Sequence, residues 1–268
     1  MQFAIIVSQK DIAGLTIKDA LLEKGFSETQ ESFDNTPIYE KNNLKLYTLE
    51  TETILSEHLD KRIKADMLIF ATRHKSESGK PTLCCHFPGN WSKAEYGGKD
   101  ATLCPTNPSI LKKVYLKLKE LGPEGFDVTM EATHHGPELN TPVMFIEIGS
   151  GEEQWKDKEA GSVLAETILN ITSSPELPPQ KIAICIGGNH YCSQFNKVVE
   201  KHDIAISHVC PKYHLEALNE DLLKQAIEKT PGKVDFILLD WNGLSSQKQK
   251  VKEILENLKL EYKRTDQI

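Results

Sequence analysis

The segment EATHHGPE, residues 131–138, places two adjacent imidazoles between two carboxylates, directly after the apolar run 126–130. Imidazole nitrogens and carboxylate oxygens serve as zinc ligands and as general acids and bases. Neighbouring residues of a regular strand point to opposite faces, so His134 and His135 can act together only from a loop. The Gly-Pro pair that follows them favours a loop. We therefore predict a metal or acid–base site here.

Four further apolar runs also end at a histidine-bearing segment. These segments are 72–76 (TRHKS), 86–90 (HFPGN), 187–190 (GGNH) and 210–214 (CPKYH). In open α/β sheets, ligands bind beyond the carboxyl ends of the strands. We therefore expect the five segments to supply a site at the edge of a sheet. The alternative for each histidine is structural, with its ring bonded to a backbone carbonyl or facing water.

Two short segments have a composition that suits anions. Gly187 and Gly188 stand between a predicted strand and a predicted helix, where backbone amides can face a negative group. They form neither a Walker A loop nor a Gly-x-Gly-x-x-Gly motif, and an ordinary tight turn is the alternative. The loop 73–80 carries three cationic residues and could clamp a phosphate or a nucleic-acid backbone. A solvated loop is the alternative there.

The length and composition are typical of a globular protein. Its 268 residues are 39% apolar, which suffices for a core, and no stretch approaches the ~20 apolar residues of a membrane span. We expect a cytoplasmic protein, because no signal peptide is evident and the six cysteines form no Cys-x-x-Cys pair. Cys84 and Cys85 could also be zinc thiolates. The net charge of −7 argues against a general nucleic-acid-binding coat but allows one local basic face.

Apolar runs alternate with helical patterns along the chain. Strands are predicted at 3–7, 44–49, 67–71, 83–86, 126–130, 143–148, 182–186, 204–209, 236–240 and 259–263. Helices are predicted near 14–24, 55–64, 108–120, 155–170, 191–201, 215–229 and 245–257. This alternation predicts an α/β protein, a three-layer α/β/α arrangement with a mixed, largely parallel sheet. We expect one unit over 1–268, with two subdomains possible around a Pro- and Ser-rich connection at 173–179.

Four of these motifs together resemble the archaeal and plant D-aminoacyl-tRNA deacylase family. They are ATRHKS (71–76), CHFPGN (85–90), EATHHGP (131–137) and GGNHY (187–191), and their order and spacing match across nearly the whole chain. The resemblance implies hydrolysis of the ester between a D-amino acid and the 3′ end of tRNA, a step of translation quality control, with zinc as cofactor. It also implies a fold related to phosphorylases and peptidyl-tRNA hydrolases.

The predicted roles follow from this chemistry. Glu131 is the expected general base or an orienting residue. The predicted catalytic set is Glu131, His135 and His74; the predicted zinc ligands are His86, His134 and His190, with His135 in reserve. The predicted substrate-binding residues are Lys75, Ser76, Lys80, Asn90, Gly187, Gly188 and Asn189, the two lysines meeting tRNA phosphates. The expected partner is aminoacyl-tRNA, without a membrane, and a monomer is plausible.

Two functions of other classes compete with this one. The first is a metal-dependent exopeptidase or phosphorylase-like enzyme acting on small molecules. The second is a non-catalytic tRNA-binding protein with structural histidines. A serine-hydrolase mechanism is disfavoured because no Gly-x-Ser-x-Gly follows a strand, and the zinc-protease motif His-Glu-x-x-His is absent.

Overall fold

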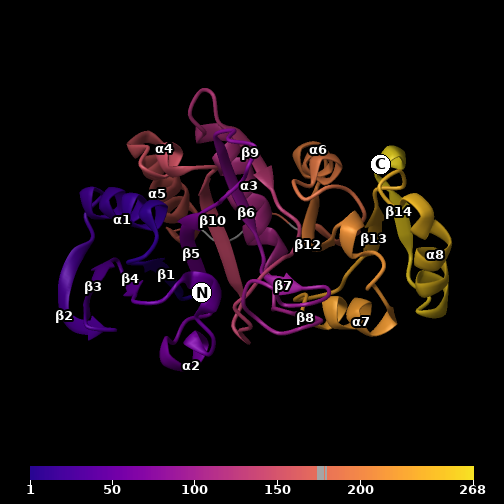
Figure 1. Ribbon diagram of the computed structural model, residues 1–268, viewed down its shortest axis with the longest axis horizontal. Coiled ribbons are helices and arrows are strands. Elements are labelled where there is room, and N and C mark those ends of the chain that lie inside the picture. The colour runs from indigo at the N-terminus through magenta and orange to yellow at the C-terminus, as the bar shows by residue number, and fades with distance from the viewer. Residues whose placement is uncertain (174–177, 179) are drawn as a thin grey trace.

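The computed structural model describes residues 1–173, 178 and 180–268, and its ribbon is shown in Figure 1. The α/β class is confirmed, but the strands form two separate main sheets where one was expected. The connection predicted at 173–179 lies almost wholly outside the described residues. None of the described helices is long and apolar enough to cross a membrane.

The larger sheet has eight strands. In spatial order they are β2 (Ser27–Phe33), β3 (Thr36–Lys41), β4 (Leu44–Leu49), β1 (Phe3–Ser8), β5 (Met67–Arg73), β10 (Val143–Gly149), β6 (Thr82–His86) and β9 (Asp127–Met130). Neighbours from β4 to β10 are parallel, and so are β6 and β9. β10 and β6 are antiparallel, so β6 and β9 run opposite to β5.

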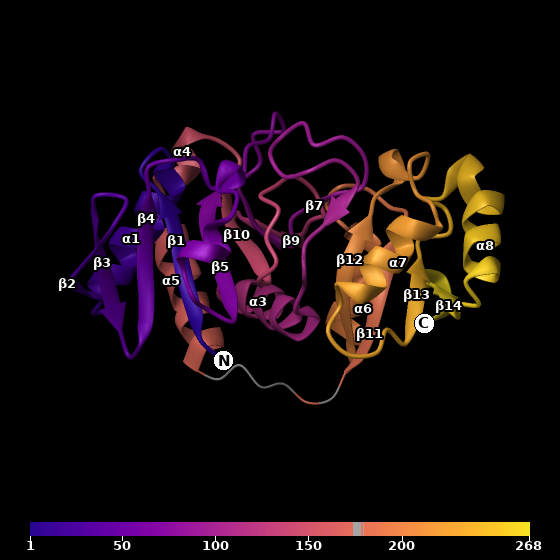
Figure 2. The same cartoon turned by 90° about the horizontal axis from the view of Figure 1, so that it is seen from below.

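The smaller sheet has four parallel strands, which read β12 (Ile204–Cys210), β11 (Lys181–Ile186), β13 (Phe236–Leu239) and β14 (Tyr262–Arg264) in spatial order. A two-stranded ribbon of β7 (Gly89–Asn90) and β8 (Thr102–Leu103) lies in the long loop after β6. Figure 2 shows the two main sheets side by side, with the segments around β7 rising between them.

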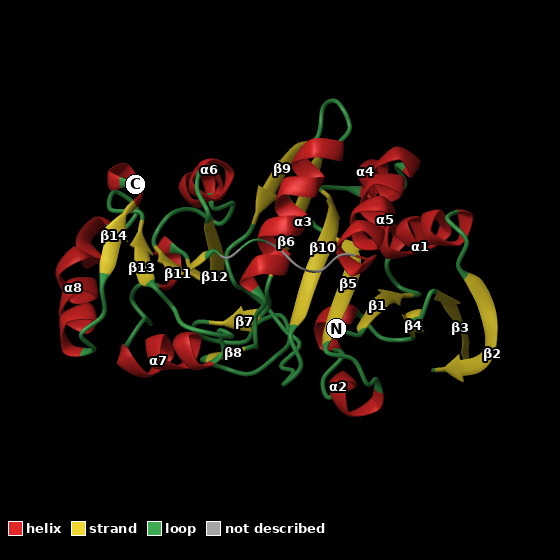
Figure 3. Cartoon of the chain, turned by 180° about the vertical axis from the view of Figure 1, so that it is seen from behind, coloured by secondary structure: helices red, strands yellow, loops and turns green. Residues whose placement is uncertain are grey.

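Helices cover these sheets as their apolar faces require. α1 (Ile12–Glu23), α3 (Pro108–Leu121) and α5 (Lys158–Ser173) pack on one face of the larger sheet (Figure 3). The short α4 (Glu152–Trp155) precedes α5, and α2 (Leu59–Arg62) lies on the other face. The smaller sheet carries α6 (Ser193–Lys201), α7 (Glu220–Glu228) and α8 (Lys248–Asn257).

One apolar core extends from the larger sheet into the smaller one. It contains α3 residues such as Val114, β10 residues such as Ile146, and Ile206 of β12, all fully or almost fully buried. α3 therefore packs against both sheets. The described residues form a continuous core because this amphipathic helix bridges the gap between the two sheet edges.

Three element predictions were wrong. The hairpin β2–β3 was missed, because residues 27–33 are polar and largely exposed and its turn uses Asp34 and Asn35 at positive φ. The helix predicted at 55–64 shrinks to a 3-10 turn, Thr53–Leu55, and the four residues of α2. α7 begins only after Asn219, whose side chain accepts a hydrogen bond from the Leu222 amide as an N-cap.

Candidate active site

The segment 131–136 runs between the two sheets and is bonded to both of them. The Glu131 amide donates to the carbonyl of Cys85 on β6 (3.1 Å), and the Thr133 amide donates to that of Val209 on β12 (3.1 Å). The Ala132 amide donates to the carbonyl of His190, just after β11 (2.8 Å). Three successive amides are thus bonded to the surrounding strands, so the side chains of this segment are held in fixed positions.

The backbone around the histidine pair adopts a conformation that depends on the residues at positions 135 and 136. His135 adopts a left-handed conformation (φ 47°), which turns the chain within the pair. A Cβ on Gly136 would lie 2.2 Å from the amide nitrogen of Gly98 in the long loop after β6. Only glycine allows that approach. The irregular turn therefore brings two adjacent imidazoles to one place, which a regular strand cannot do.

Three histidines present one free nitrogen each to a common point. The Nδ1 atoms of His86, His134 and His135 lie 3.1, 2.7 and 2.7 Å from the carbonyl oxygens of Phe87, Ala132 and Gly136, respectively. A carbonyl only accepts, so each Nδ1 carries the proton and each Nε2 keeps its lone pair. One ligand atom from each ring lies within 4.8 Å of the others. The buried Nε2 of His86 has no hydrogen-bond partner among the described residues.

Burial keeps these imidazoles neutral. It lowers the pKa of His86 to about 3 and that of His135 to about 4, and it lowers the pKa of His134 well below the usual value. Neighbouring imidazoles add to the lowering at all three rings. Neutral imidazole is the form that binds a metal. Three neutral rings with inward-facing lone pairs and one orphaned nitrogen fit a divalent ion bound by nitrogen ligands.

Glu131 lies beneath the imidazoles. Its side chain is fully buried, and its Oε1 is 3.1 Å from Nδ1 of His74 and 3.5 Å from Nε2 of His190. Its Oε2 is 3.8 Å from Nε2 of His134. Burial raises the pKa of Glu131, but the contact of the carboxylate with the His190 ring, together with the nearby His74 ring, lowers this pKa by more, so the carboxylate is charged. Neither carboxylate oxygen has a well-aligned hydrogen bond among the described residues, which leaves both able to accept a proton.

A second buried carboxylate, Glu147 of β10, was missed from sequence. Its Oε1 accepts from the Thr72 hydroxyl (2.7 Å), and its Oε2 lies 3.6 Å from the Cys84 thiol and 3.7 Å from Nδ1 of His74. Burial, and then the charge of Glu131, raise the pKa of Glu147. The signal was present: one carboxylate stands in an otherwise apolar, fully buried strand, and such a charge requires partners.

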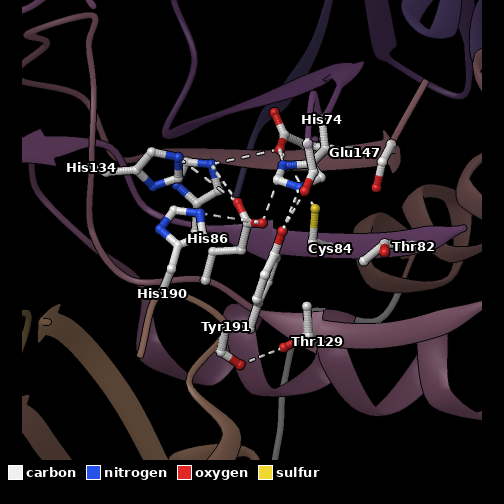
Figure 4. Close-up of polar contacts among 12 residues, drawn as sticks. His74, Thr82, Cys84, His86, Thr129, His134, Glu147, His190 and Tyr191 are labelled. Atoms are coloured by element: carbon white, nitrogen blue, oxygen red, sulfur yellow. Dashed lines mark hydrogen bonds and ion pairs between the residues drawn. The ribbon is translucent and has the colours of Figure 1, made fainter. Parts of the chain in front are cut away.

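The site lies across a sheet face and not at one sheet edge, which corrects the expected geometry. β6 runs antiparallel to β10, and the register sets Cys84 opposite Glu147 and His86 opposite Phe145. These side chains share one face, and His74 reaches it from the end of the oppositely directed β5. Figure 4 shows His74, His86, His134, Glu147 and Cys84 converging from different elements.

Two tyrosines, which were not among the predicted site residues, contact His74 and His190. The Tyr191 hydroxyl donates to Oγ of Ser76 (3.0 Å) and lies 3.3 Å from Nε2 of His74. The Tyr213 hydroxyl lies 2.9 Å from Nδ1 of His190. Tyr191 also lines a groove of about 640 Å³ beside the site, with Thr129 and Lys80 among its other walls.

Several of the predicted substrate-binding residues are already bonded within the chain. The Asn90 amide nitrogen donates to the carbonyls of Gly97 and Lys99 (3.0 and 3.4 Å). Asn189 bonds to Ser193, where its Oδ1 accepts from the amide at the start of α6. The Gly187 amide donates to the Cys210 carbonyl (2.8 Å). Gly188 packs against Asp240 and Gly243. Lys75 and Lys80 are exposed.

Among the residues that the structure describes, three overlapping groups of side chains could hold a metal ion. The first is His86, His134 and His135; the second is His74, Cys84, Glu131 and Glu147; the third is Glu131, His134 and His190. Of the predicted ligands, His86 and His134 therefore meet in one group, and His190 joins His134 in another. His135 completes the first group. The Cys84 thiol is neutral, because burial raises its pKa well above the usual value.

The chain is similar to known proteins along nearly its whole length. A family model described as D-aminoacyl-tRNA deacylase matches residues 61–263. A protein of that name from Thermococcus onnurineus is 40% identical over 96% of this chain and 98% of its own, and one from Methanosarcina barkeri is 34% identical over 100% and 90%. A crystal structure titled as a conserved protein of unknown function superposes with a TM-score of 0.90 at 31% identity, over 99% of this chain and 95% of its own.

Proposed function

The chain belongs to the D-aminoacyl-tRNA deacylase family, and we propose that the ester of its substrate is hydrolysed at the cluster around Glu131. The reaction is the hydrolysis of D-aminoacyl-tRNA to a free D-amino acid and tRNA. The observation that carries the assignment of the site is the meeting of three neutral imidazoles above a charged, buried carboxylate. Such a cluster suits ester hydrolysis, which needs a positioned water and a proton acceptor.

The direct test of this function compares matched D- and L-aminoacyl-tRNA as substrates. We expect release of the D-amino acid at a far higher kcat/KM than the L-amino acid, and no release of either by a His134→Ala/His135→Ala variant. Equal release of the D- and the L-amino acid would show that the enzyme has no chiral preference. Tight tRNA binding without release of either would indicate a non-catalytic tRNA-binding protein.

We assign a zinc ion to His86, His134 and His135. Their Nδ1 protons are committed to carbonyls, and three nitrogens with an open fourth position are a common ligand set of catalytic zinc sites. When bound, zinc lowers the pKa of a water molecule and polarises a carbonyl oxygen. This assignment takes His135 in place of the predicted His190, because His190 is already held between the Tyr213 hydroxyl and Glu131.

The residues of the chain move the protons. Glu131 accepts a proton from the attacking water while the oxygen of that water bonds to the ester carbonyl carbon. The bond from that carbon to the ribose oxygen then breaks, and Glu131 returns the proton to the ribose oxygen, leaving a free hydroxyl on tRNA. His74 and His190 flank the Glu131 carboxylate, with ring nitrogens 3.1 and 3.5 Å from its Oε1. Glu147 stays protonated beside His74, so that only one negative charge is buried there.

We further propose that tRNA is held by local cations, in the cytoplasm where aminoacyl-tRNA is used. Lys75 and Lys80 are exposed, and Lys80 lines the groove that Tyr191 also borders. Neither has an ion pair with any residue that the structure describes. Unpaired lysines can neutralise phosphates and release their counterions, and they do so without a positive net charge on the protein.

A further inference from the structure

The segment 210–214, the fifth strand-end segment of the sequence, takes no direct part in the proton transfers above. It carries Tyr213, which at 51% accessible is one of the most exposed large hydrophobic side chains in the described part of the chain. The ring is nevertheless fixed. Its hydroxyl lies 2.9 Å from Nδ1 of His190, and its ring packs against those of His190 and His214 with centroids 6.4 and 4.7 Å apart.

The neighbours of Tyr213 are themselves held in place. Nδ1 of His214 lies 3.1 Å from Oγ of Ser92, in the long loop after β6. The indole nitrogen of Trp91 in that loop donates to the Val209 carbonyl of β12 (3.0 Å). The loop and the segment 210–214 are thus joined, and the open side of the Tyr213 ring is presented to solvent in one orientation. An ordered, exposed aromatic ring binds a flat partner with little loss of conformational entropy.

The substrate carries a flat group at a matching place. The amino acid of aminoacyl-tRNA is esterified to the ribose of the 3′-terminal adenosine, so its adenine always lies one sugar away from the bond that is cleaved. Tyr213 is likewise one side chain away from the cluster, because His190 contacts Tyr213 through one ring nitrogen and Glu131 through the other. Lys212, the preceding residue, is exposed and forms no ion pair within the described part of the chain.

We propose that Tyr213 is the binding residue for the 3′-terminal adenosine, whose adenine stacks on the exposed face of the ring. Proteins bind unpaired strands of nucleic acid through such stacking of bases on aromatic side chains. The Tyr213 hydroxyl is turned to His190, so recognition uses the ring face and not the hydroxyl. The inference rests on the proposed site, but it concerns binding and is measurable without ester hydrolysis.

The test measures the affinity for two deacylated tRNAs, one complete and one lacking only the terminal adenosine. Tyr213→Ala should weaken binding of the complete tRNA by about 5- to 150-fold, the range expected for one stacked base. The same change should leave the shortened tRNA unaffected. Tyr213→Phe keeps the ring and should bind both tRNAs like the unmodified protein. Tyr262→Ala, on the distant β14 and 39% exposed, is the matched control.

A second measurement reports the stacking itself. With 2-aminopurine in place of the terminal adenine, binding to the unmodified protein and to Tyr213→Phe should quench the fluorescence, and binding to Tyr213→Ala should not. Equal weakening of both tRNAs by Tyr213→Ala, or a Phe variant as weak as the Ala variant, would overturn the proposal. D-aminoacyl-tRNA hydrolysis, followed in parallel, shows separately whether the proposed function fails.

Discussion

Backbone carbonyls decide what the clustered histidines can do. His86, His134 and His135 each donate a hydrogen bond from Nδ1 to a backbone carbonyl one or two residues away. The lone pair of the opposite nitrogen, Nε2, is thereby left free to bind a metal ion. Hydrogen bonds from the ring nitrogen that does not bind the metal fix both the tautomer and the orientation of the ring. The sequence shows the histidines and their loops. It does not show these short-range bonds, because they depend on the local backbone conformation beside each ring, such as the φ of 47° at His135.

For a single residue, we expect Glu131→Gln to lower the rate of ester hydrolysis strongly and the affinity for tRNA only slightly. The amide cannot accept the proton of the attacking water, and loss of a general base costs about 10²- to 10⁴-fold in rate. Single-turnover hydrolysis of D-aminoacyl-tRNA measures the effect, and affinity for deacylated tRNA is the control. A folded variant with a near-normal single-turnover rate would limit Glu131 to an orienting role.

Buried histidines should also make the protein sensitive to acid. Burial lowers the pKa of His208, on β12, from 6.5 to about 3. Below pH 6.5 the unfolded chain binds a proton that the folded chain does not bind until about pH 3, so stability falls as the pH falls through this window. One such histidine contributes about 1.4 kcal/mol per pH unit to the free energy of unfolding.

Urea unfolding of chelator-treated protein between about pH 7 and 5 measures this dependence. His208→Gln should reduce the slope of stability against pH by about one proton, and His202→Gln, at the partly exposed end of α6, is the matched control. Identical slopes in all three proteins would show that His208 is not kept neutral by the fold.

At the scale of elements, the pairing of β10 with β6 creates the site. Most strands and helices could be predicted from periodicity, including the buried run that contains Glu147. The direction of β6 could not, since a parallel or an antiparallel neighbour suits the same apolar pattern. That direction sets Glu147 opposite Cys84 and moves the site from a sheet edge to a sheet face. The polar hairpin β2–β3 was missed because its residues bury little apolar surface.

The close approach of the histidine turn to the long loop predicts a sensitive position. A Cβ at Gly136 would meet Gly98 and Gly97 backbone atoms at 2.2 and 2.3 Å. Gly136→Ala should therefore displace the turn, lower the stability by about 1–3 kcal/mol and reduce turnover. Gly151→Ala is the matched control, because its Cβ would meet only the Gln154 side chain, at 3.4 Å. Thermal unfolding and single-turnover rates that are unchanged in Gly136→Ala would contradict this packing.

At the scale of the whole molecule, a net charge of −7 coexists with a polyanionic substrate. Binding must then depend on a few local cations, and removing one lysine that pairs with a phosphate should reduce the slope of log affinity against log salt by about one. Lys75→Ala/Lys80→Ala should reduce the slope for deacylated tRNA by about two. Lys181→Ala/Lys233→Ala, at the opposite end of the smaller sheet, should not change it. An unchanged slope in the first variant would place the tRNA surface elsewhere, for example on the lysine-bearing face of α3.

The central claim is that His86, His134 and His135 hold a zinc ion that the hydrolysis needs. The most direct measurement determines metal content by elemental analysis and the single-turnover rate in the same samples, before chelation, after chelation and after zinc is added back. We predict that the zinc content and the rate fall together and recover together. We also predict that His86→Ala neither retains zinc nor recovers. Full hydrolysis of D-aminoacyl-tRNA by a sample shown to be metal-free would contradict the claim.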